Sequence, residues 1–305
     1  MDIGMVGLGH MGGNMVRRLA RGGARIRAFD VSPLARAAMH EVAGATAVES
    51  LAELVQALPS PRVIWLMLPA GTVSQDTVDV LAPLLQAGDV LVDGANAYYK
   101  DSIARGTDLA ARGIHFVDAG VSGGVWGLEN GYAIMLGGAP QAVRRVEPFV
   151  KILAPAPDAG WLHCGPVGAG HFVKMVHNGI EYGMMQAYAE GFALMAAKQE
   201  LQLDVAAIAQ MWRHGSVVRS WLLDLSAEFL ARDARLDEIE PHVADSGEGR
   251  WTALEGIELG VPTPVMTLAL MARFTSQGKA DYASKLLAMM RNMFGGHAIL
   301  HDKQP

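Results

Sequence analysis

The chain has little cysteine, few charged residues and no long uninterrupted apolar run. Its single cysteine, Cys164, excludes a disulfide framework within the chain and a zinc site built from several cysteines. Charged residues make up 18% of the sequence and the formal net charge is −6, which favours neither a nucleic-acid partner nor an anionic membrane surface. No segment has the length or apolarity of a membrane span or a signal peptide. We therefore expect a cytoplasmic protein.

The composition is that of a well-buried globular protein. Hydrophobic residues make up 51% of the 305 residues, which is enough chain for two domains of ordinary size. The histidines outside the motifs described below show no metal-ligand spacing, so the sequence predicts no metal site.

The first half of the chain alternates short apolar runs with amphipathic stretches. This alternation implies crossover connections and a mainly parallel, doubly wound sheet. The expected strands are Ile3–Val6, Arg25–Phe29, Val63–Met67, Val90–Asp93 and His115–Asp118, followed by Tyr132–Leu136, whose direction stays open, and Gly160–His163. Clear helical patterns cover Met11–Arg21, Pro33–Glu41 and Val73–Leu85.

The second half of the chain is helical in pattern. From Val167 to about Lys198 there is no proline and apolar residues recur at helical spacing, which predicts a helix about 45 Å long. Further helices are expected up to about Gly295. The fold class is therefore α/β: a Rossmann-type dinucleotide-binding domain over residues 1–165, then an all-α substrate and oligomerisation domain over residues 166–305, with a long helix between them.

A glycine motif follows the first expected strand and begins the first helix. Gly7 permits a tight turn, Gly9 lets the backbone approach a pyrophosphate, and Gly12 lets helix and strand pack closely. The pyrophosphate would lie at the N-terminus of the helix, where His10 and Met11 precede Gly12 and free N–H groups favour an anion. The pattern predicts a dinucleotide cofactor.

Asp30, at the end of the second strand, bears on the choice of cofactor. An acid at about this distance from the glycines bonds the ribose hydroxyls of the adenosine and repels a 2′-phosphate. Val31 occupies a position where an arginine would favour NADP, so NAD is the expected cofactor, although Arg36 is able to fold back. The alternative is that Asp30 only caps the turn at Ser32.

The long helix carries an amine and a carboxylate on one face. Lys174, Asn178 and Glu181 are spaced i, i+4, i+7, with Tyr182 beside them. An amine and a carboxylate near one reacting carbon can divide proton transfer between them. The alternative is a solvated stripe of ion pairs.

Three segments resemble the β-hydroxyacid dehydrogenase superfamily: Val-Gly-Leu-Gly-His-Met-Gly at 6–12, Gly-Val-Ser-Gly-Gly at 120–124 and Gly-Ala-Gly-His-Phe-Val-Lys at 168–174. The run His-Asn-Gly-Ile-Glu-Tyr-Gly at 177–183 resembles, more narrowly, the 6-phosphogluconate dehydrogenase family. The chain is similar to the short bacterial branch of that family, which is often NAD-linked. The resemblance implies oxidative decarboxylation of 6-phosphogluconate to ribulose 5-phosphate in the pentose phosphate pathway.

The resemblance also implies roles for individual residues. Lys174 would take the proton of the C3 hydroxyl as hydride leaves for the nicotinamide, and would then stabilise the oxyanion of the enediol. Glu181 would protonate C1, while Asn178 and His177 would hold the sugar hydroxyls and the carboxylate. The wall between nicotinamide and substrate would consist of Asn96, Ser122, Gly123 and Gly124.

The phosphate end matches the family unevenly. Tyr182 and Arg273 fit phosphate contacts, and so do Arg291 and His297, which the family supplies from a neighbouring subunit of a homodimer or homotetramer. Read only as surface residues, Arg273 would lie on a helix face and Arg291 at a helix end. The chain also departs from the long form of the family, because Ser246 and Glu248 replace residues that bind phosphate there.

Two alternatives therefore stay open. Ser246 and Glu248 favour a β-hydroxyacid dehydrogenase for an unphosphorylated acid such as 3-hydroxyisobutyrate or gluconate. The other alternative is a nucleotide sensor or scaffold with the same fold and no catalytic activity, since fold does not fix function.

Overall fold

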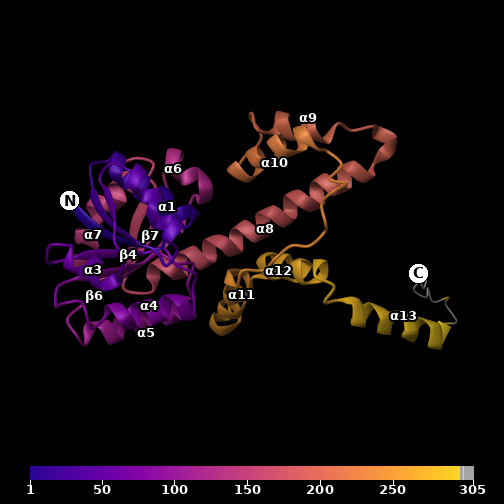
Figure 1. Cartoon of the computed structure of the whole chain (residues 1–305). Helices are drawn as coiled ribbons and strands as arrows, with labels where there is room; N and C mark the ends of the chain where they lie inside the picture. The colour runs from indigo at the N-terminus through magenta and orange to yellow at the C-terminus, as the bar shows by residue number, and fades with distance from the viewer. Residues whose placement is uncertain (296–297, 299–305) are drawn as a thin grey trace. The chain divides into compact units, whose positions relative to one another are not determined.

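The computed structural model describes residues 1–295 and 298. The chain folds into two compact units, Met1–Val176 and a second unit that begins at His177. Helix α8 (Ala169–Ala197) is shared by the two units, so the boundary expected at residue 165 stays a prediction. Figure 1 labels the helices and strands along the chain.

The first unit contains one sheet of eight strands in the order β3-β2-β1-β4-β5-β6-β7-β8. Strand β7 runs antiparallel to β6, and all other neighbours are parallel, which confirms the doubly wound prediction and settles the direction left open. The strands are β1 (Asp2–Val6), β2 (Arg25–Phe29), β3 (Ala45–Ala47), β4 (Val63–Leu66), β5 (Val90–Asp93), β6 (His115–Ser122), β7 (Ala133–Gly138) and β8 (Trp161–Gly165).

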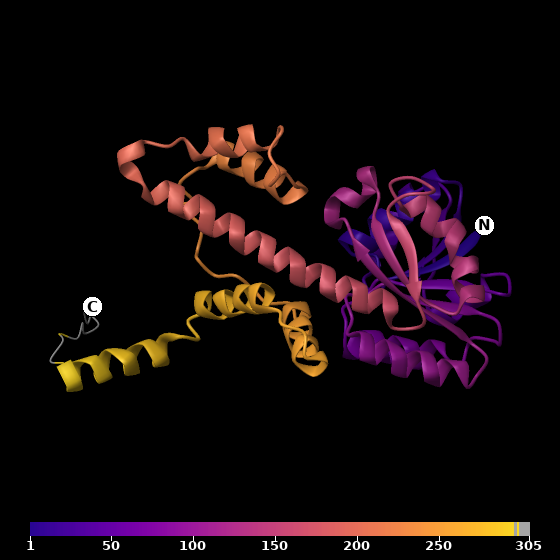
Figure 2. The same ribbon diagram turned by 180° about the vertical axis from the view of Figure 1, so that it is seen from behind.

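Helices cover both faces of this sheet, as the two opposite views in Figures 1 and 2 show. On one face, α1 (His10–Arg21) and α7 (Pro140–Leu153) bury apolar residues against the strands. On the other face lie α3 (Leu51–Gln56), α4 (Thr72–Leu81) and α5 (Tyr99–Ala110). Each fully buried Leu, Ile or Met in these two clusters contributes about 1.5–3 kcal/mol.

Short elements complete the first unit. The helix expected over Pro33–Glu41 is instead α2 (Pro33–Ala37) followed by a 3-10 turn, η1 (Ala38–Glu41). Ser32 caps α2 by accepting the N–H of Ala35 and Pro33 begins the helix, as helix N-termini favour. After β6 come η2 (Gly124–Trp126) and α6 (Gly127–Asn130).

The described part of the second unit is helical. Besides the rest of α8 it contains η3 (Gln199–Leu201), α9 (Val205–Trp212), α10 (Trp221–Arg232), α11 (Glu248–Leu259), α12 (Pro264–Ser276) and α13 (Asp281–Gly295). Asp204 caps α9 and Ser220 caps α10 through side-chain oxygens that accept backbone N–H groups. The all-α prediction is confirmed.

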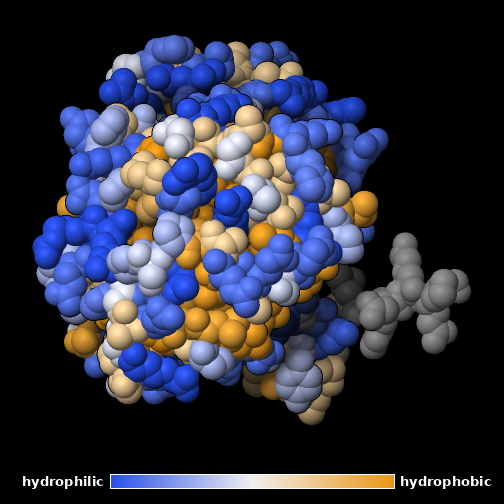
Figure 3. All heavy atoms as spheres, turned by 60° about the vertical axis from the view of Figure 1, so that its left-hand side comes forward, coloured by the Kyte–Doolittle hydropathy of each residue, from blue (hydrophilic) through white to orange (hydrophobic). Residues whose placement is uncertain are grey.

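The apolar core of the second unit is small. Among the described residues of this unit, one cluster of buried apolar side chains is present, and it consists of Ala209, Leu223, Ala227 and Leu230. Many large apolar side chains on its helices stay exposed, among them Leu194 at 74% and Met293 at 78%. Figure 3 shows one face of the molecule, on which hydrophobic residues lie at the surface among hydrophilic ones. No helix in the described range has the length and apolarity that a bilayer crossing needs.

Candidate active site

The glycine turn after β1 is compact on one side and open on the other. Gly7 has φ +92° and donates its N–H to the carbonyl of Phe29 over 2.9 Å. A Cβ on Gly12 would lie 2.0 Å from the carbonyl oxygen of Gly7, so no side chain fits there. A Cβ on Gly9 would meet nothing within 4 Å, which leaves its backbone bare for a ligand.

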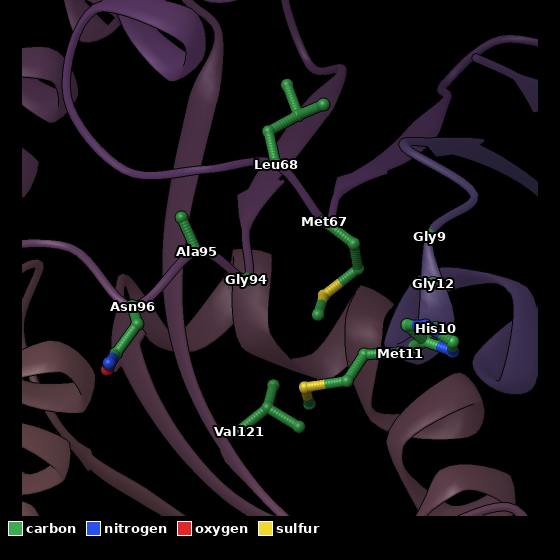
Figure 4. A pocket seen from close by; sticks show the side chains of 10 residues that line it. All are labelled: Gly9, His10, Met11, Gly12, Met67, Leu68, Gly94, Ala95, Asn96 and Val121. Atoms are coloured by element: carbon green, nitrogen blue, oxygen red, sulfur yellow. The ribbon is translucent and has the colours of Figure 1, made fainter. Parts of the chain in front are cut away.

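A cavity of about 290 Å³ lies at this turn, and Figure 4 shows its lining. Of the predicted cofactor residues, those that line it are Gly9, His10, Met11, Gly12 and Asn96. Sequence reasoning missed the others, which are Met67, Leu68, Gly94, Ala95 and Val121. These residues lie at or just after the carboxyl ends of β4, β5 and β6, where ligands bind in open α/β sheets. Their position at strand ends is the sequence feature that would have identified them as lining residues.

The loop that carries Asn96 is braced from inside the protein. The carboxylate of Asp93, which is fully buried, accepts the N–H of Ala95 over 3.0 Å. Its other oxygen accepts from Arg105 Nη1 over 2.8 Å, and Arg105 Nε donates to Gln75 over 2.8 Å. Because breaking a buried, hydrogen-bonded ion pair is costly, the pair of Asp93 and Arg105 holds the turn that leads to Asn96 in one conformation.

Asp30 lies beside the glycine turn, outside the cavity lining. Its Oδ2 accepts the N–H of Leu8 and its Oδ1 accepts the N–H of Ser32, each over 2.7 Å. The turn-capping interpretation is therefore realised, and each oxygen retains a lone pair for a ribose hydroxyl. Arg36 does fold back: its Nη1 donates to the carbonyl of Asp30 over 2.8 Å.

The start of α8 is anchored to the sheet by one buried carboxylate. Asp118 of β6 accepts the N–H of Gly168 over 2.6 Å and the N–H of His171 over 2.8 Å. These two bonds satisfy donors at the N-terminus of α8 and place a negative charge at the positive end of its dipole. The Nδ1 of His171, itself 1% exposed, lies 2.7 Å from the hydroxyl of Ser102 on α5. Together these contacts fix where the helix begins.

Lys174 packs against Gly120 of β6, where no larger residue than glycine would fit. A Cβ built on Gly120 would lie 2.4 Å from Cβ of Lys174. The next residue of β6, Val121, lines the cavity at the glycine turn. Lys174 is 8% exposed. The sequence signal for this contact was the glycine within a strand, which often marks close approach of another backbone.

The following residues of the run lie in the part of α8 that belongs to the second unit. Asn178 is 9% exposed, and its side-chain oxygen lies 3.1 Å from Nδ1 of His177. The same Nδ1 is 3.8 Å from the carboxylate of Glu181, and both of those side chains are over one third exposed. The solvated-stripe alternative therefore does not describe the buried pair Lys174 and Asn178.

Three of the four predicted wall residues lie at the end of β6 and in the turn after it, while Asn96 follows β5. Ser122 is the last residue of the strand. Gly123 has φ +141° and Gly124 has φ +52°, which explains why two glycines follow the serine. The structure places all three directly after Val121 of the cavity lining.

Within the second unit, Tyr182 is the centre of a polar cluster. Its hydroxyl lies 3.2 Å from the hydroxyl of Ser246, and the guanidinium of Arg273 stacks 3.4 Å above its ring. Nη1 of Arg273 donates to the carbonyl of Ala244 over 2.8 Å. The structure thus brings together Tyr182 and Arg273, two of the predicted phosphate residues.

Glu248 is the unusual member of this cluster. It is 1% exposed, and its Oε2 accepts the hydroxyl of Ser246 over 2.6 Å. Its Oε1 has no hydrogen-bond partner among the described residues. A buried carboxylate with one free oxygen is costly unless a donor reaches it.

Only one of the two C-terminal candidates lies within the described residues. Arg291 lies on α13 and is exposed. His297 lies outside the described residues. In the ranges that the structure covers, no group of three or more His, Cys, Asp or Glu side chains is arranged to hold a metal ion.

Two further groups have shifted pKa values. Burial raises the pKa of the Tyr132 phenol to about 12, and it raises the pKa of the Cys164 thiol above its usual range. Neither residue lines the cavity at the glycine turn.

Two protein-family models together match nearly the whole chain. Residues 2–165 match the NAD binding domain of 6-phosphogluconate dehydrogenase. Residues 170–293 match the C-terminal domain of 6-phosphogluconate dehydrogenase.

Individual proteins agree with this match. An NAD(+)-dependent, decarboxylating 6-phosphogluconate dehydrogenase of Haloferax volcanii is 40% identical over 98% of this chain and 98% of its own length. The 6-phosphogluconate dehydrogenase of Plasmodium falciparum, solved with NADP+ and with its substrate, has a TM-score of 0.84 at 30% identity, covering 100% of this chain and 67% of its own. A 3-hydroxyisobutyrate dehydrogenase of Salmonella typhimurium has a TM-score of 0.74 at 25% identity, covering 92% of this chain and 95% of its own.

Proposed function

Because the chain belongs to the 6-phosphogluconate dehydrogenase family, we propose that it oxidises and decarboxylates 6-phosphogluconate, giving ribulose 5-phosphate and CO2 with reduction of NAD. The observation that carries the proposal is the contact of Lys174 with Gly120, since it holds an amine beside the strand whose end lines the cofactor cavity. We place the reaction in the cytoplasm, as part of the same proposal.

The residues of the first unit fit the dinucleotide. The open side of Gly9 and the N-terminus of α1 suit the pyrophosphate, and Asp30 retains acceptor capacity for the adenosine ribose. When bound, NAD accepts the hydride that leaves the substrate. Asn96, Ser122, Gly123 and Gly124 would separate the nicotinamide from the sugar acid.

Lys174 is the residue to which we assign proton transfer at C3. As a free amine it takes the proton of the C3 hydroxyl, and the product is a 3-keto acid. The β-carboxylate of that acid leaves as CO2, because the adjacent carbonyl accepts the electron pair. The ammonium of Lys174 stabilises the enediolate oxygen and donates its proton to it, which gives the enediol, the substrate of the next step.

Residues later in α8 complete the assignment. Glu181 donates a proton to C1 while the hydroxyl proton of the enediol passes to Lys174, and the enediol thereby becomes ribulose 5-phosphate. His177 and Asn178, which lie in hydrogen-bond contact with one another, hold the sugar hydroxyls and the carboxylate. Each of these roles follows the position of the residue in the family motif.

The phosphate would be bound by Tyr182 and Arg273, with Arg291 and His297 supplied by a second copy of the chain. Arginine suits this task because its planar fork binds two oxygens at once. The exposed apolar side chains of α13 support a homodimer or homotetramer, since an uncovered apolar face usually marks an interface.

Steady-state kinetics test the proposal directly. We expect NAD reduction and CO2 release with 6-phosphogluconate at a kcat/KM far above that with gluconate or 3-hydroxyisobutyrate. A folded sample that reduces neither NAD nor NADP with 6-phosphogluconate would rule the proposal out.

A second candidate, a dehydrogenase for an unphosphorylated hydroxyacid, is favoured by Glu248. Its buried carboxylate with a free oxygen suits a hydroxyl donor better than a phosphate. The candidates are separated by Arg291→Ala. On phosphogluconate oxidation this variant should raise KM for the phosphorylated substrate and leave gluconate unaffected. If the protein is instead a dehydrogenase for an unphosphorylated hydroxyacid, Arg291→Ala should change KM for neither substrate.

A further inference from the structure

Two acidic residues lie at the edge of the sheet where the adenosine end of the cofactor is expected. Strands β2 and β3 are parallel neighbours, with Ala28 paired to Ala47. Asp30 directly follows β2, and Glu49 follows β3 after one residue. Because the carboxyl ends of parallel strands meet at one edge, Glu49 comes to the same edge as Asp30 although 19 positions separate them.

Arg36 of α2 is held between these two segments. Its Nη1 donates to the carbonyl of Asp30 over 2.8 Å and to that of Val31 over 3.3 Å. Its Nη2 donates to the carboxylate of Glu49 over 2.6 Å, while its Nε is buried with no hydrogen-bond partner among the described residues. The guanidinium is therefore fixed by its two terminal nitrogens.

Glu49 is held in place by its own backbone. Its N–H donates to the carboxylate of Glu53 over 2.8 Å, and Glu53 lies in the first turn of α3, which Ser50 caps. The side chain of Glu49 is 76% exposed, whereas that of Arg36 is 15% exposed. The carboxylate thus faces solvent, on the open side of an arginine that is itself mostly covered.

This arrangement removes the cation that a 2′-phosphate would need. NADP differs from NAD by a phosphate on the adenosine ribose, and a guanidinium binds it best when both terminal nitrogens are free. Here both nitrogens are engaged. Asp30 and Glu49 each carry a negative charge and Arg36 carries one positive charge, so the segment stays net negative.

We propose that Glu49 is a cofactor-specificity residue, which favours NAD by pairing Arg36 and by adding a second negative charge near Asp30. The inference rests on the proposed NAD-dependent oxidation and assigns the selectivity to a residue outside the glycine motif. Asp30 acts on the ribose hydroxyls directly, whereas Glu49 acts through Arg36.

The test is Glu49→Gln, which removes the charge and keeps the shape of the side chain. We expect the ratio of kcat/KM for NADP to that for NAD to rise about threefold, because an exposed ion pair is worth little more than this. The change should lie in KM for NADP and in the affinity for NADPH measured by fluorescence titration. The kcat at saturating NAD should stay unchanged.

A matched control is Glu41→Gln, an exposed acid at the end of η1 that is not among the hydrogen-bond or ion-pair partners of Arg36 in the described chain. It changes the net charge equally and should leave the cofactor ratio unaltered. In an Arg36→Gln background, Glu49→Gln should have a smaller effect than in the wild-type chain, since its action through Arg36 is gone.

Three outcomes would overturn the inference: an unchanged ratio in Glu49→Gln, an equal change in Glu41→Gln, or an equal loss of affinity for NADH and NADPH. Failure of the proposed function looks different. In that case 6-phosphogluconate is not oxidised with either cofactor, while the titrations with NADH and NADPH still report the selectivity of the cofactor segment.

Discussion

The two units of this protein differ in how they bury their apolar residues. The first unit has two apolar clusters, one on each face of its sheet, with many side chains completely covered. In its described part, the second unit has a single small cluster and leaves large side chains exposed on α8, α12 and α13. A sheet with helices on both faces encloses its own core, whereas a chain of separate helices needs other surfaces to cover it.

The difference also separates the proposed tasks. In the first unit the cofactor turn, Asp118 and Lys174 are each fixed by hydrogen bonds or by close backbone packing. In the second, the cluster around Tyr182 includes a buried carboxylate oxygen without a partner in the described chain. Buried polar atoms without a partner among the described residues also occur in the first unit, so the expectation that a second copy completes the second unit rests on its exposed apolar helices.

The largest expected effect comes from Lys174→Met in the first unit. Loss of the proposed base should lower kcat by about a thousandfold or more, while NADH binding stays within about twofold. Rapid-mixing kinetics and fluorescence titration measure the two quantities. The matched control is Lys151→Met, a half-exposed lysine of α7 that pairs with Glu147, and it should keep full activity. Near-normal turnover in Lys174→Met would show that Lys174 is not the base.

Core truncations compare the two units directly. Leu54 of the first unit and Leu223 of the second are both fully buried. We expect Leu54→Ala to cost about 3–5 kcal/mol in free energy of unfolding and Leu223→Ala about 2 kcal/mol, because a small cluster collapses more easily around a cavity. Urea unfolding gives both values, with Leu194→Ala, at a 74% exposed site, as a control near zero. A cost for Leu223→Ala equal to that for Leu54→Ala would contradict the contrast between the cores.

The exposed face of α13 tests whether a second copy covers the second unit. Leu286 and Met290 lie four residues apart on this helix and are 46% and 47% exposed. Replacing both with lysine should weaken self-association about tenfold or more, measured by sedimentation, because apolar anchors dominate interface energy. The control Ser284→Lys adds a charge at an exposed polar position of the same helix. Unchanged association in the double variant would exclude this face from the interface.

The smallest effect, and one limited to alkaline pH, is expected for Tyr132→Phe. Tyr132 is fully buried and its hydroxyl has no hydrogen-bond partner among the described residues, so removing it should cost almost nothing at pH 7. Burial raises the pKa of Tyr132 from 10.0 to about 12 in the folded protein. The unfolded chain therefore loses this proton first as pH rises, and stability falls between about pH 10 and 12.

In Tyr132→Phe that loss should be absent, so unfolding curves between pH 10 and 12 should fall less steeply than for the wild-type chain. Identical pH dependence in the two proteins would show that the phenol does not titrate differently on folding.

Several elements were predictable because their signal is local. The glycine turn needs particular backbone angles, and the long helix α8 shows its period directly in the sequence. Strand β3 was missed because its three residues, Ala45–Ala47, carry no apolar run. Strand β6 was predicted too short, to Asp118 instead of Ser122, because Gly120 interrupts the apolar pattern. That glycine is present for its contact with Lys174, which lies far away in sequence.

The candidate site divides in the same way. The sequence placed Lys174, Asn178 and Glu181 on one helix, since helical spacing depends only on neighbours along the chain. It gave no sign that Arg36 pairs with Glu49, or that Glu248 is buried beside Ser246.

The amino-acid sequence alone determined the order of strands and helices, the glycine turn for a dinucleotide and the family to which the chain belongs. Only the tertiary structure decided that Lys174 lies over Gly120, that Met67 and Val121 line the cavity, and that Arg36 is paired. The reason is physical: backbone preferences act between neighbours along the chain, whereas burial and charge pairing depend on which distant segments the sheet brings to one edge.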